Sequence, residues 1–184
     1  VSDKNECEML KRMPDHERVG MLKKMGFVES QDSTQRQSLS DGEISMLKKL
    51  VDFQSHTRLH PVLPRCTPER AKEEIEKAKT ELEQRLGRRI YALAYPNGDY
   101  SDREIMLARA AGYDCALTLD GCVNRANTDL FRLGRMGVSD SADANELIVK
   151  ASGLWDILLR LSGRSYYTQS GGSTAEPAQS SSKR

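Results

Sequence analysis

Apolar side chains recur three or four positions apart along much of the chain, a spacing that places them on one face of a helix. This pattern predicts helices over residues 14–25, 40–50, 67–86, 101–111 and 143–161. The clearest is 67–86, whose apolar stripe consists of Ala71, Ile75, Ala78, Leu82 and Leu86. Its other positions are rich in Glu, Lys and Arg, with Glu73 four residues before Lys77, so we expect them to form a solvated surface.

Residues with strong preferences for helix ends mark the limits of these segments. Ser40 with Glu43, and Ser101 with Glu104, have the spacing of a capping box, in which a hydroxyl and a carboxylate each satisfy a free backbone N–H. Thr67 is a suitable N-cap for the long helix. The remaining markers are Pro14 and Pro68 at helix starts, Gly26, Gly87 and Gly112 at helix ends, and Ser152-Gly153 as an expected break.

Short apolar runs between these helices predict strands over residues 51–55, 90–95 and 113–119, and a further one within 131–138. The run 90–95 has the composition of a strand that is buried on both faces of a parallel sheet. Strands and helices therefore alternate, which favours βαβ units and the α/β class. Ligands of such folds bind at the carboxyl ends of the strands, so residues that directly follow a strand are candidates for chemistry.

Length and charge narrow the range of functions. The chain has 184 residues, the size of one domain, and a net charge of +1, so no overall field favours nucleic acid or an anionic membrane. No run approaches the roughly 18 apolar residues that a membrane span requires. The four cysteines lack CxxC spacing, so we expect neither a disulfide scaffold nor a cysteine zinc site. The Ser-, Gly- and Gln-rich residues 165–184 are expected to be a disordered tail.

Two of the three histidines, His56 and His60, lie four residues apart directly after the predicted strand 51–55. If this segment forms one turn of helix, both imidazoles lie on one face, close enough to share a metal ion. The simpler alternative is a loop with two solvent-facing histidines, or with one histidine bonded to a backbone carbonyl. The spacing of the two histidines is compatible with both.

The sequence on both sides of these histidines resembles one family. Residues 55–61 read Ser-His-Thr-Arg-Leu-His-Pro and residues 93–101 read Leu-Ala-Tyr-Pro-Asn-Gly-Asp-Tyr-Ser, followed by Ala-Gly-Tyr at 111–113 and Leu-Gly-Arg at 133–135. In this order and separation the motifs resemble those of the NodB-homology polysaccharide deacetylases, carbohydrate esterase family four. The resemblance implies a partial (β/α) barrel of the NodB-homology type, incomplete at its N-terminal side. Residues 40–164 would be the carboxyl-terminal part of that domain, and residues 1–39 a helical segment of the same domain.

The resemblance also implies a metal-dependent hydrolase that removes N-acetyl or O-acetyl groups from a carbohydrate polymer. By match, His56 and His60 would hold a divalent cation, which in this family is usually zinc. The backbone N–H at Asn97 would help to hold the developing oxyanion, with Tyr95 and Pro96 shaping the groove. Arg135 matches an arginine near the end of the family's domain and is a candidate catalytic residue; a surface arginine is the simpler alternative.

The chain departs from the family at the acidic motif. Family members carry the metal-binding Asp and the base Asp in a Thr-Phe-Asp-Asp-Gly motif ahead of the histidines, whereas the Asp-Gly pairs of this chain are Asp41-Gly42 and Asp120-Gly121. The chain also begins without Met, so we expect it to be a fragment, to be inactive alone, and to rely on a missing N-terminal segment or an oligomer partner. The alternatives are a non-catalytic glycan- or protein-binding remnant and an unrelated α/β domain. Family members are mostly exported, which points to an extracellular, periplasmic or cell-surface location.

Overall fold

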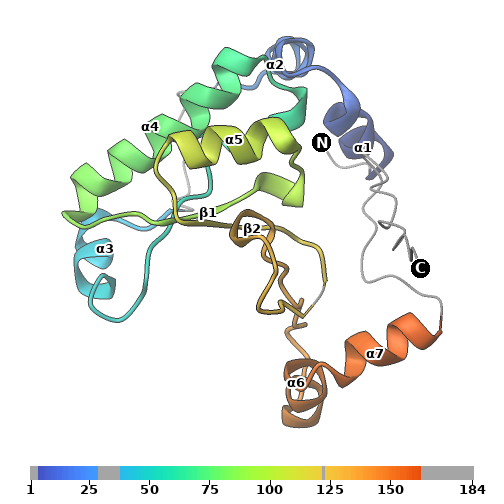
Figure 1. The fold of residues 1–184 in the computed structure, drawn as a ribbon. Coiled ribbons are helices and arrows are strands. Elements are labelled where there is room, and N and C mark those ends of the chain that lie inside the picture. Colours follow the sequence, from blue (N-terminus) through green and yellow to red (C-terminus); the bar gives the residue numbers. More distant parts are fainter. Residues whose placement is uncertain (1–3, 29–37, 122, 163–184) are drawn as a thin grey trace, which may run out of the picture.

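Parallel β-structure lies at the centre of the protein (Figure 1). The structure is a computed structural model that describes residues 4–28, 38–121 and 123–162. Strand β1 (Ala92–Ala94) pairs in parallel with strand β2 (Cys115–Leu117). A helix connects the two strands, which makes a βαβ unit and confirms the predicted α/β class.

The helices begin and end close to the residues whose preferences predict them. Complete capping boxes open helix α3 (Asp41–Leu47) and helix α5 (Asp102–Ala110). The Thr67 side chain caps helix α4 (Pro68–Leu86), and Gly87 ends it in the left-handed conformation with a φ of 66°. These local signals are read correctly from sequence because each satisfies backbone groups of its own helix.

The helices at the two ends of the chain agree with the predicted segments, with one addition. Helix α2 (Asp15–Lys24) follows Pro14 as expected. The stretch predicted over 143–161 divides into helix α6 (Ala144–Ala151) and helix α7 (Leu154–Leu161) at the expected break. Helix α1 (Lys4–Arg12) has no counterpart among the predicted helices.

Two of the predicted strands are wrong. In 51–55, Ser55 alone pairs, through an isolated parallel bridge to Leu93. The Gln54 side chain takes the place of a longer ladder, because its Oε1 accepts hydrogen bonds from two backbone N–H groups of the β1 segment at 3.0 Å each. In 131–138, Leu133 alone pairs, with Leu117. The Asp129 side chain, which accepts from the backbone N–H of Phe131 at 3.0 Å, opens a short 3-10 helix (Leu130–Arg132) just ahead of it.

The core lies between the β-structure and the two helices that cover it, α4 and α5 (Figure 1). The 3-10 helix Leu63–Arg65 adds Leu63 to this core. The largest fully enclosed apolar side chains are Tyr95, Leu63, Ile75, Ile90 and Leu93. Each side chain of this kind stabilises the fold by about 1.5–3 kcal/mol through burial.

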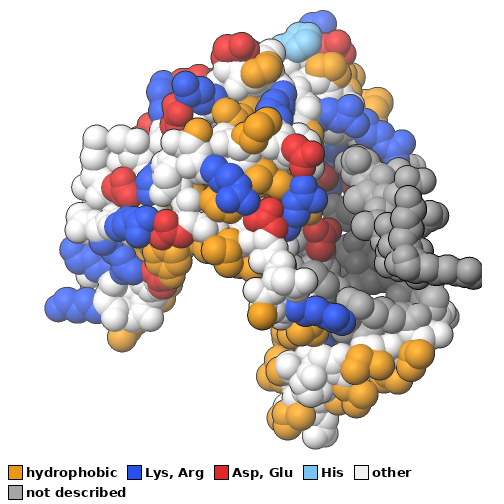
Figure 2. Space-filling view, in the orientation of Figure 1, with side chains coloured by type: hydrophobic (Ala, Val, Ile, Leu, Met, Phe, Trp, Pro, Cys, Tyr) orange, Lys and Arg blue, Asp and Glu red, His pale blue; other side chains and the backbone are white. Residues whose placement is uncertain are grey.

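Helices α6 and α7 lie apart from this core and carry apolar side chains on their surface (Figures 1 and 2). Exposed examples are Leu147, Ile148, Leu154, Trp155, Ile157, Leu158 and Leu161. Among the described residues, no helix combines the length and apolar character that crossing a membrane requires. The predicted tail 165–184 and residues 1–3 and 29–37 of the predicted N-terminal segment lie outside the described residues.

Candidate functional site

The carboxyl ends of the parallel segments bring the predicted site residues to one edge of the β-structure. His56 directly follows the bridge residue Ser55, and Asn97 follows strand β1 by three residues. Arg135 comes two residues after the bridge residue Leu133. Because these segments all run parallel to one another, their carboxyl ends meet at the same edge, where α/β folds bind ligands.

The two histidine rings are in contact. The ring centroids of His56 and His60 lie 4.7 Å apart with an interplanar angle of 75°. Of the two alternatives that the spacing allows, the structure has the loop: residues 56–62 form no helical turn, and Thr57 and His60 have left-handed φ values of 63° and 54°. The backbone N–H of His60 donates to Thr57 Oγ1 at 3.2 Å, which closes the loop. A loop, rather than a helix face, therefore produces the convergence.

His56 is held in one orientation by the strand beside it. Its Nδ1 lies 2.8 Å from the backbone carbonyl oxygen of Ala94. A carbonyl only accepts, so Nδ1 carries the proton and Nε2 keeps a lone pair, as in many metal-ligating histidines. Burial lowers the pKa of His56, and the charges of His60 and Arg135 act in the same direction, while the Ala94 carbonyl opposes them. The ring is therefore biased toward the neutral form that binds metals.

The Tyr-Pro-Asn turn forms the rim of the site above a buried support. Tyr95 is fully buried, and its hydroxyl donates to the backbone carbonyl of Phe131 at 3.2 Å. Its ring stacks on Tyr100 with centroids 5.0 Å apart. Pro96 is also buried, whereas Asn97 is partly exposed with a φ of 55°. Tyr95 and Pro96 thus lie beneath the surface of the turn, and Asn97 lies on it.

Two of the backbone N–H groups of this turn donate hydrogen bonds within the turn. Gly98 N donates to the Tyr95 carbonyl and Asp99 N to the Pro96 carbonyl, each at 3.0 Å. No residue in the described part of the chain accepts a hydrogen bond from the Asn97 N–H. The family resemblance implies that this donor would bind a developing oxyanion.

Arg135 is fixed close to the carboxyl end of strand β2. Its Nε donates to the Thr118 carbonyl at 2.8 Å, and its backbone N–H donates to the Asp120 carbonyl at 3.1 Å. The side chain is partly buried, and its charge adds a small contribution to the lowering of the His56 pKa, which is due mainly to burial. Arg135 therefore lies in the neighbourhood of the histidine pair rather than on a remote surface.

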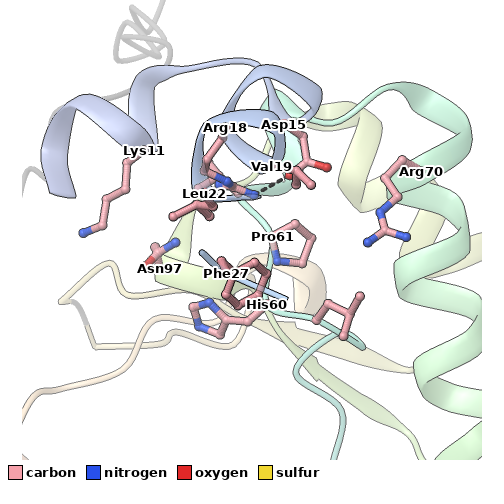
Figure 3. Close-up of a pocket in the computed structure, with 12 residues that line it drawn as sticks. Lys11, Asp15, Arg18, Val19, Leu22, Phe27, His60, Pro61, Arg70 and Asn97 are labelled. Carbon is pink, nitrogen blue, oxygen red and sulfur yellow. Dashed lines mark hydrogen bonds and ion pairs between the residues drawn. The ribbon is translucent and has the colours of Figure 1, made fainter. Parts of the chain in front are cut away.

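A pocket of about 330 Å³ opens beside His60. Figure 3 shows the His60 ring and Asn97 toward one side of it and Arg70 at the opposite side, with helix α2 forming the roof. Its lining residues are Lys11, Asp15, Arg18, Val19, Leu22, Phe27, Leu59, His60, Pro61, Val62, Arg70 and Asn97. Six of these residues are apolar and six are polar or charged, so the pocket offers both apolar contact and hydrogen-bonding groups.

The imidazole pair fits two positions of a metal site. Zinc–nitrogen bonds are about 2.0–2.1 Å long, so two ligating rings must lie as close together as these two rings do. A complete site needs at least one more protein ligand. Within residues 4–28, 38–121 and 123–162, no group of three or more His, Cys, Asp or Glu side chains has the geometry to hold a cation. The described residues therefore do not form a complete metal site.

Sequence reasoning missed Glu74, the buried carboxylate that contacts the histidine loop. The position belongs to a helix segment whose charged residues were expected to be solvated, and Glu73 does pair with Lys77 at the surface. Glu74, however, has 0% exposure. The signal was its register, because position 74 falls three residues after Ala71 and four before Ala78, on the apolar stripe itself.

Comparison with known families identifies the family of this chain. The sequence profile of the polysaccharide deacetylase family matches residues 23–116, more than half of the chain, including both histidines and the Tyr-Pro-Asn turn. The protein belongs to the polysaccharide deacetylase family. A comparison with curated protein sequences gave no match.

Solved structures of deacetylases share the fold. The Streptococcus pyogenes deacetylase PplD, solved in complex with acetate, has a TM-score of 0.59 and 25% identity, over 61% of this chain and 50% of its own. A polysaccharide deacetylase from Bacillus cereus has a TM-score of 0.56 and 19% identity, over 75% of this chain and 48% of its own. A protein described as a putative polysaccharide deacetylase from Bacillus anthracis has a TM-score of 0.54 and 20% identity, over 77% of this chain and 48% of its own. The predicted partial NodB-type fold is thus confirmed, and the chain spans about half the length of these proteins.

Proposed function

We propose that this chain forms the histidine side of a metal-dependent hydrolase that removes acetyl groups from a carbohydrate polymer. One observation carries the proposal: the two imidazoles converge at the carboxyl edge of the β-structure, where Asn97 also lies. Membership of the polysaccharide deacetylase family supports the substrate class. Whether the acetyl group is linked through nitrogen or oxygen is a question for the assay below.

His56 and His60 are the residues that would hold a divalent cation, with zinc as the first choice because it favours imidazole nitrogen. Such a cation, when bound, would supply electrostatic activation of a water molecule and of the acetyl carbonyl. The hydrogen bond from His56 Nδ1 to the Ala94 carbonyl leaves Nε2 as the ligand atom. Two imidazoles leave half of the coordination shell to other groups, so binding to this chain alone would be weak.

The Tyr-Pro-Asn turn would bind the reacting acetyl group. The Asn97 N–H would donate to the carbonyl oxygen as negative charge develops on it, in the manner of an oxyanion hole. Tyr95 and Pro96 are buried beneath the turn and would hold it rigid. Arg135 would add a positive charge near His56, and its hydrogen bond to the Thr118 carbonyl would hold its side chain in place.

Two acidic functions remain to be supplied. The proposed chemistry needs a carboxylate as third ligand and a second carboxylate as general base. We assign both to residues outside the described ones, on a preceding segment or on a partner chain, and expect no appreciable turnover by this chain alone. A monomer that releases acetate unaided would contradict this assignment.

A non-catalytic glycan- or protein-binding role is the second candidate. The observation in its favour is that no acidic side chain in the described part of the chain completes a metal cluster with the histidines. The pocket beside His60 would then bind its ligand through shape and hydrogen bonds alone.

Binding of acetylated oligosaccharides distinguishes the two candidates. The chain would be titrated with N-acetylated and O-acetylated oligosaccharides, with Zn²⁺ and with EDTA, and acetate release would be measured in parallel. The deacetylase proposal predicts binding that strengthens with Zn²⁺ and is lost in His56→Ala and His60→Ala. Binding that is equal in EDTA and in both variants would contradict it and support the non-catalytic role.

A further inference from the structure

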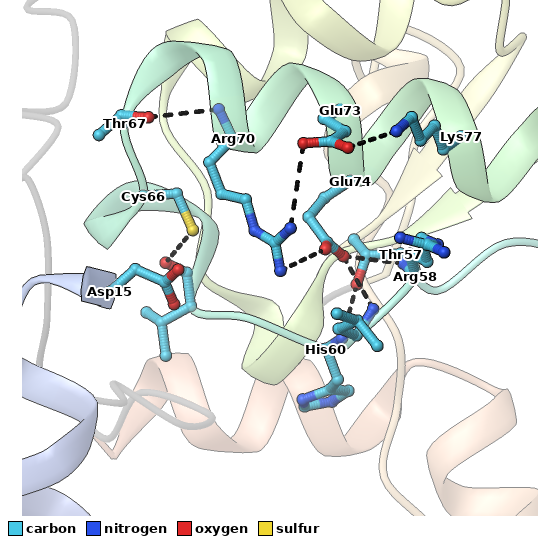
Figure 4. Close-up of polar contacts among 12 residues, drawn as sticks. Asp15, Thr57, Arg58, His60, Cys66, Thr67, Arg70, Glu73, Glu74 and Lys77 are labelled. Atoms are coloured by element: carbon cyan, nitrogen blue, oxygen red, sulfur yellow. Dashed lines mark hydrogen bonds and ion pairs between the residues drawn. The ribbon is translucent and has the colours of Figure 1, made fainter. Parts of the chain in front are cut away.

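Glu74 joins helix α4 to the loop that carries the two histidines (Figure 4). Its Oε2 accepts hydrogen bonds from the backbone N–H of Arg58 at 3.0 Å and of Leu59 at 2.8 Å. Its Oε1 lies 3.0 Å from Arg70 Nη2. The side chain has 0% exposure, and the Arg70 guanidinium balances the charge of the buried carboxylate. The hydrogen bonds of the carboxylate are made by Oε2, and Oε1 has the ion pair alone.

The loop needs an acceptor at this point. Arg58 and Leu59 lie between Thr57 and His60, which both have left-handed backbone conformations. Neither a helix nor a strand is present to accept the two consecutive N–H groups. Successive N–H groups in such a bent backbone point to one side and form a concave anion site, and the Glu74 carboxylate occupies it.

We propose that Glu74 is a positioning residue that holds the His60 ring against the His56 ring. His56 is fixed from the other side, by the Ala94 carbonyl of strand β1. The position of His60 depends on how the loop bends between the two histidines, and the contacts from Glu74 fix that bend. Glu74 holds the two rings together whether or not a cation is bound. The effect of Glu74 on cation affinity rests on the proposed function.

Variants of Glu74 and of its neighbour test the inference. Glu74→Met keeps a side chain of similar length but removes both acceptor oxygens. Glu74→Gln keeps one oxygen that can accept from Arg58 and Leu59, so it separates the loop contacts from the ion pair with Arg70. Glu73→Met is the matched control, because Glu73 is the preceding residue of the same helix and is partly exposed. It pairs with Lys77 and lies 4.0 Å from Arg70, so this variant also reports the effect of removing a contact to Arg70.

The first measurement is the nuclear Overhauser effect between the two imidazole rings in the metal-free full chain. We expect the inter-ring signal in the parent protein, in Glu73→Met and in Glu74→Gln, and its loss in Glu74→Met. Circular dichroism checks that the helices persist. An unchanged signal in Glu74→Met, or loss in Glu74→Gln equal to that in Glu74→Met, would overturn the role of the acceptor oxygens.

Zn²⁺ titration by calorimetry separates this inference from the proposed function. We expect Glu74→Met to weaken Zn²⁺ binding about tenfold and Glu73→Met to leave it unchanged. Binding that needs both histidines but is unaffected in Glu74→Met overturns the inference and leaves the proposed function standing. If the parent protein does not bind Zn²⁺ but the inter-ring signals are as expected above, the proposed function is overturned and the inference about Glu74 stands.

Amide hydrogen exchange of the parent protein covers the case in which Glu74→Met does not fold. The N–H groups of Arg58 and Leu59 should exchange at least about tenfold more slowly than in an unstructured peptide, although both residues are exposed. Exchange at the unstructured rate would overturn the proposal, because it would mean that the carboxylate does not hold these two groups.

Discussion

At the scale of single residues, backbone strain is concentrated at the candidate site. Among the described residues, Thr57, His60 and Asn97 are the non-glycine residues with positive φ. Each such conformation costs on the order of 1–3 kcal/mol and persists where surrounding contacts impose it. The contacts here are the loop closure by Thr57, the Glu74 carboxylate and the buried Tyr95 beneath the turn. The contacts that stabilise the fold therefore also offset the strain at the site.

Gly98 should be intolerant of any side chain. A Cβ at this position would lie 2.6 Å from the Cβ and 2.9 Å from the backbone nitrogen of Leu119, and the φ of 74° disfavours other residues. Gly98→Ala is expected to lower the free energy of unfolding by about 2 kcal/mol or more in urea denaturation. Gly20→Ala, within helix α2 and with open space around it, should instead raise it by roughly 0.5–1 kcal/mol. Equal effects of the two substitutions would contradict the account.

Cys66 should resist alkylation in the folded protein. Burial raises the pKa of its thiol to about 12, and the thiolate is the reactive form. At pH 8 the thiol therefore stays protonated, and its Sγ donates to the Val62 carbonyl at 3.6 Å. Iodoacetamide labelling followed by peptide mass spectrometry should modify Cys66 far more slowly in buffer than in urea. Similar rates in the two solvents would show that the side chain is accessible.

At the scale of elements, the sequence is informative where a signal is local. Helices α3, α4 and α5 are predicted correctly because their caps satisfy their own N–H groups. The strands predicted at 51–55 and 131–138 are wrong because strand pairing depends on a distant partner. The Gln54 side chain bonds to the β1 segment in the first, and a short 3-10 helix opened by Asp129 lies at the start of the second. The contact between His56 and His60 is predicted, but the loop that produces it depends on Glu74, sixteen residues from Arg58. Burial of that carboxylate is a tertiary property.

The two capping boxes should differ in their contribution to stability. Ser101 Oγ donates to Glu104 Oε2 at 2.5 Å, and Glu104 is fully buried, whereas Ser40 and its box are exposed. Removing a partner from a buried carboxylate costs more than removing one in solvent. Ser101→Ala should therefore lower the free energy of unfolding by about 1–2 kcal/mol and Ser40→Ala by about 0.5 kcal/mol. An equal loss would indicate that burial does not distinguish the boxes.

At the scale of the whole molecule, the protein divides into a packed centre and less packed ends. Helix α4 has five buried residues, while helix α6 has none. The exposed apolar surface of α6 and α7 and the short strands suit a protein that associates with further structure. This agrees with the proposal that a preceding segment or partner supplies the acidic ligands.

Hydrogen exchange should reveal this division. Amides of α4 are expected to exchange only through opening of the packed centre, whereas those of α6 and α7 should exchange much faster because few buried contacts hold them. Mass spectrometry of peptic peptides measures both in one experiment. Protection of α6 equal to that of α4 in the isolated chain would contradict the account.

The central claim is that two imidazoles of this chain converge on one cation. X-ray absorption at the zinc edge tests it most directly, since it reports the number and kind of ligands on the metal. The account predicts two imidazole nitrogens at about 2.0–2.1 Å with oxygen ligands completing the shell, and the loss of one imidazole in His56→Ala and in His60→Ala. A spectrum with one imidazole or none, or one that neither substitution alters, would contradict it.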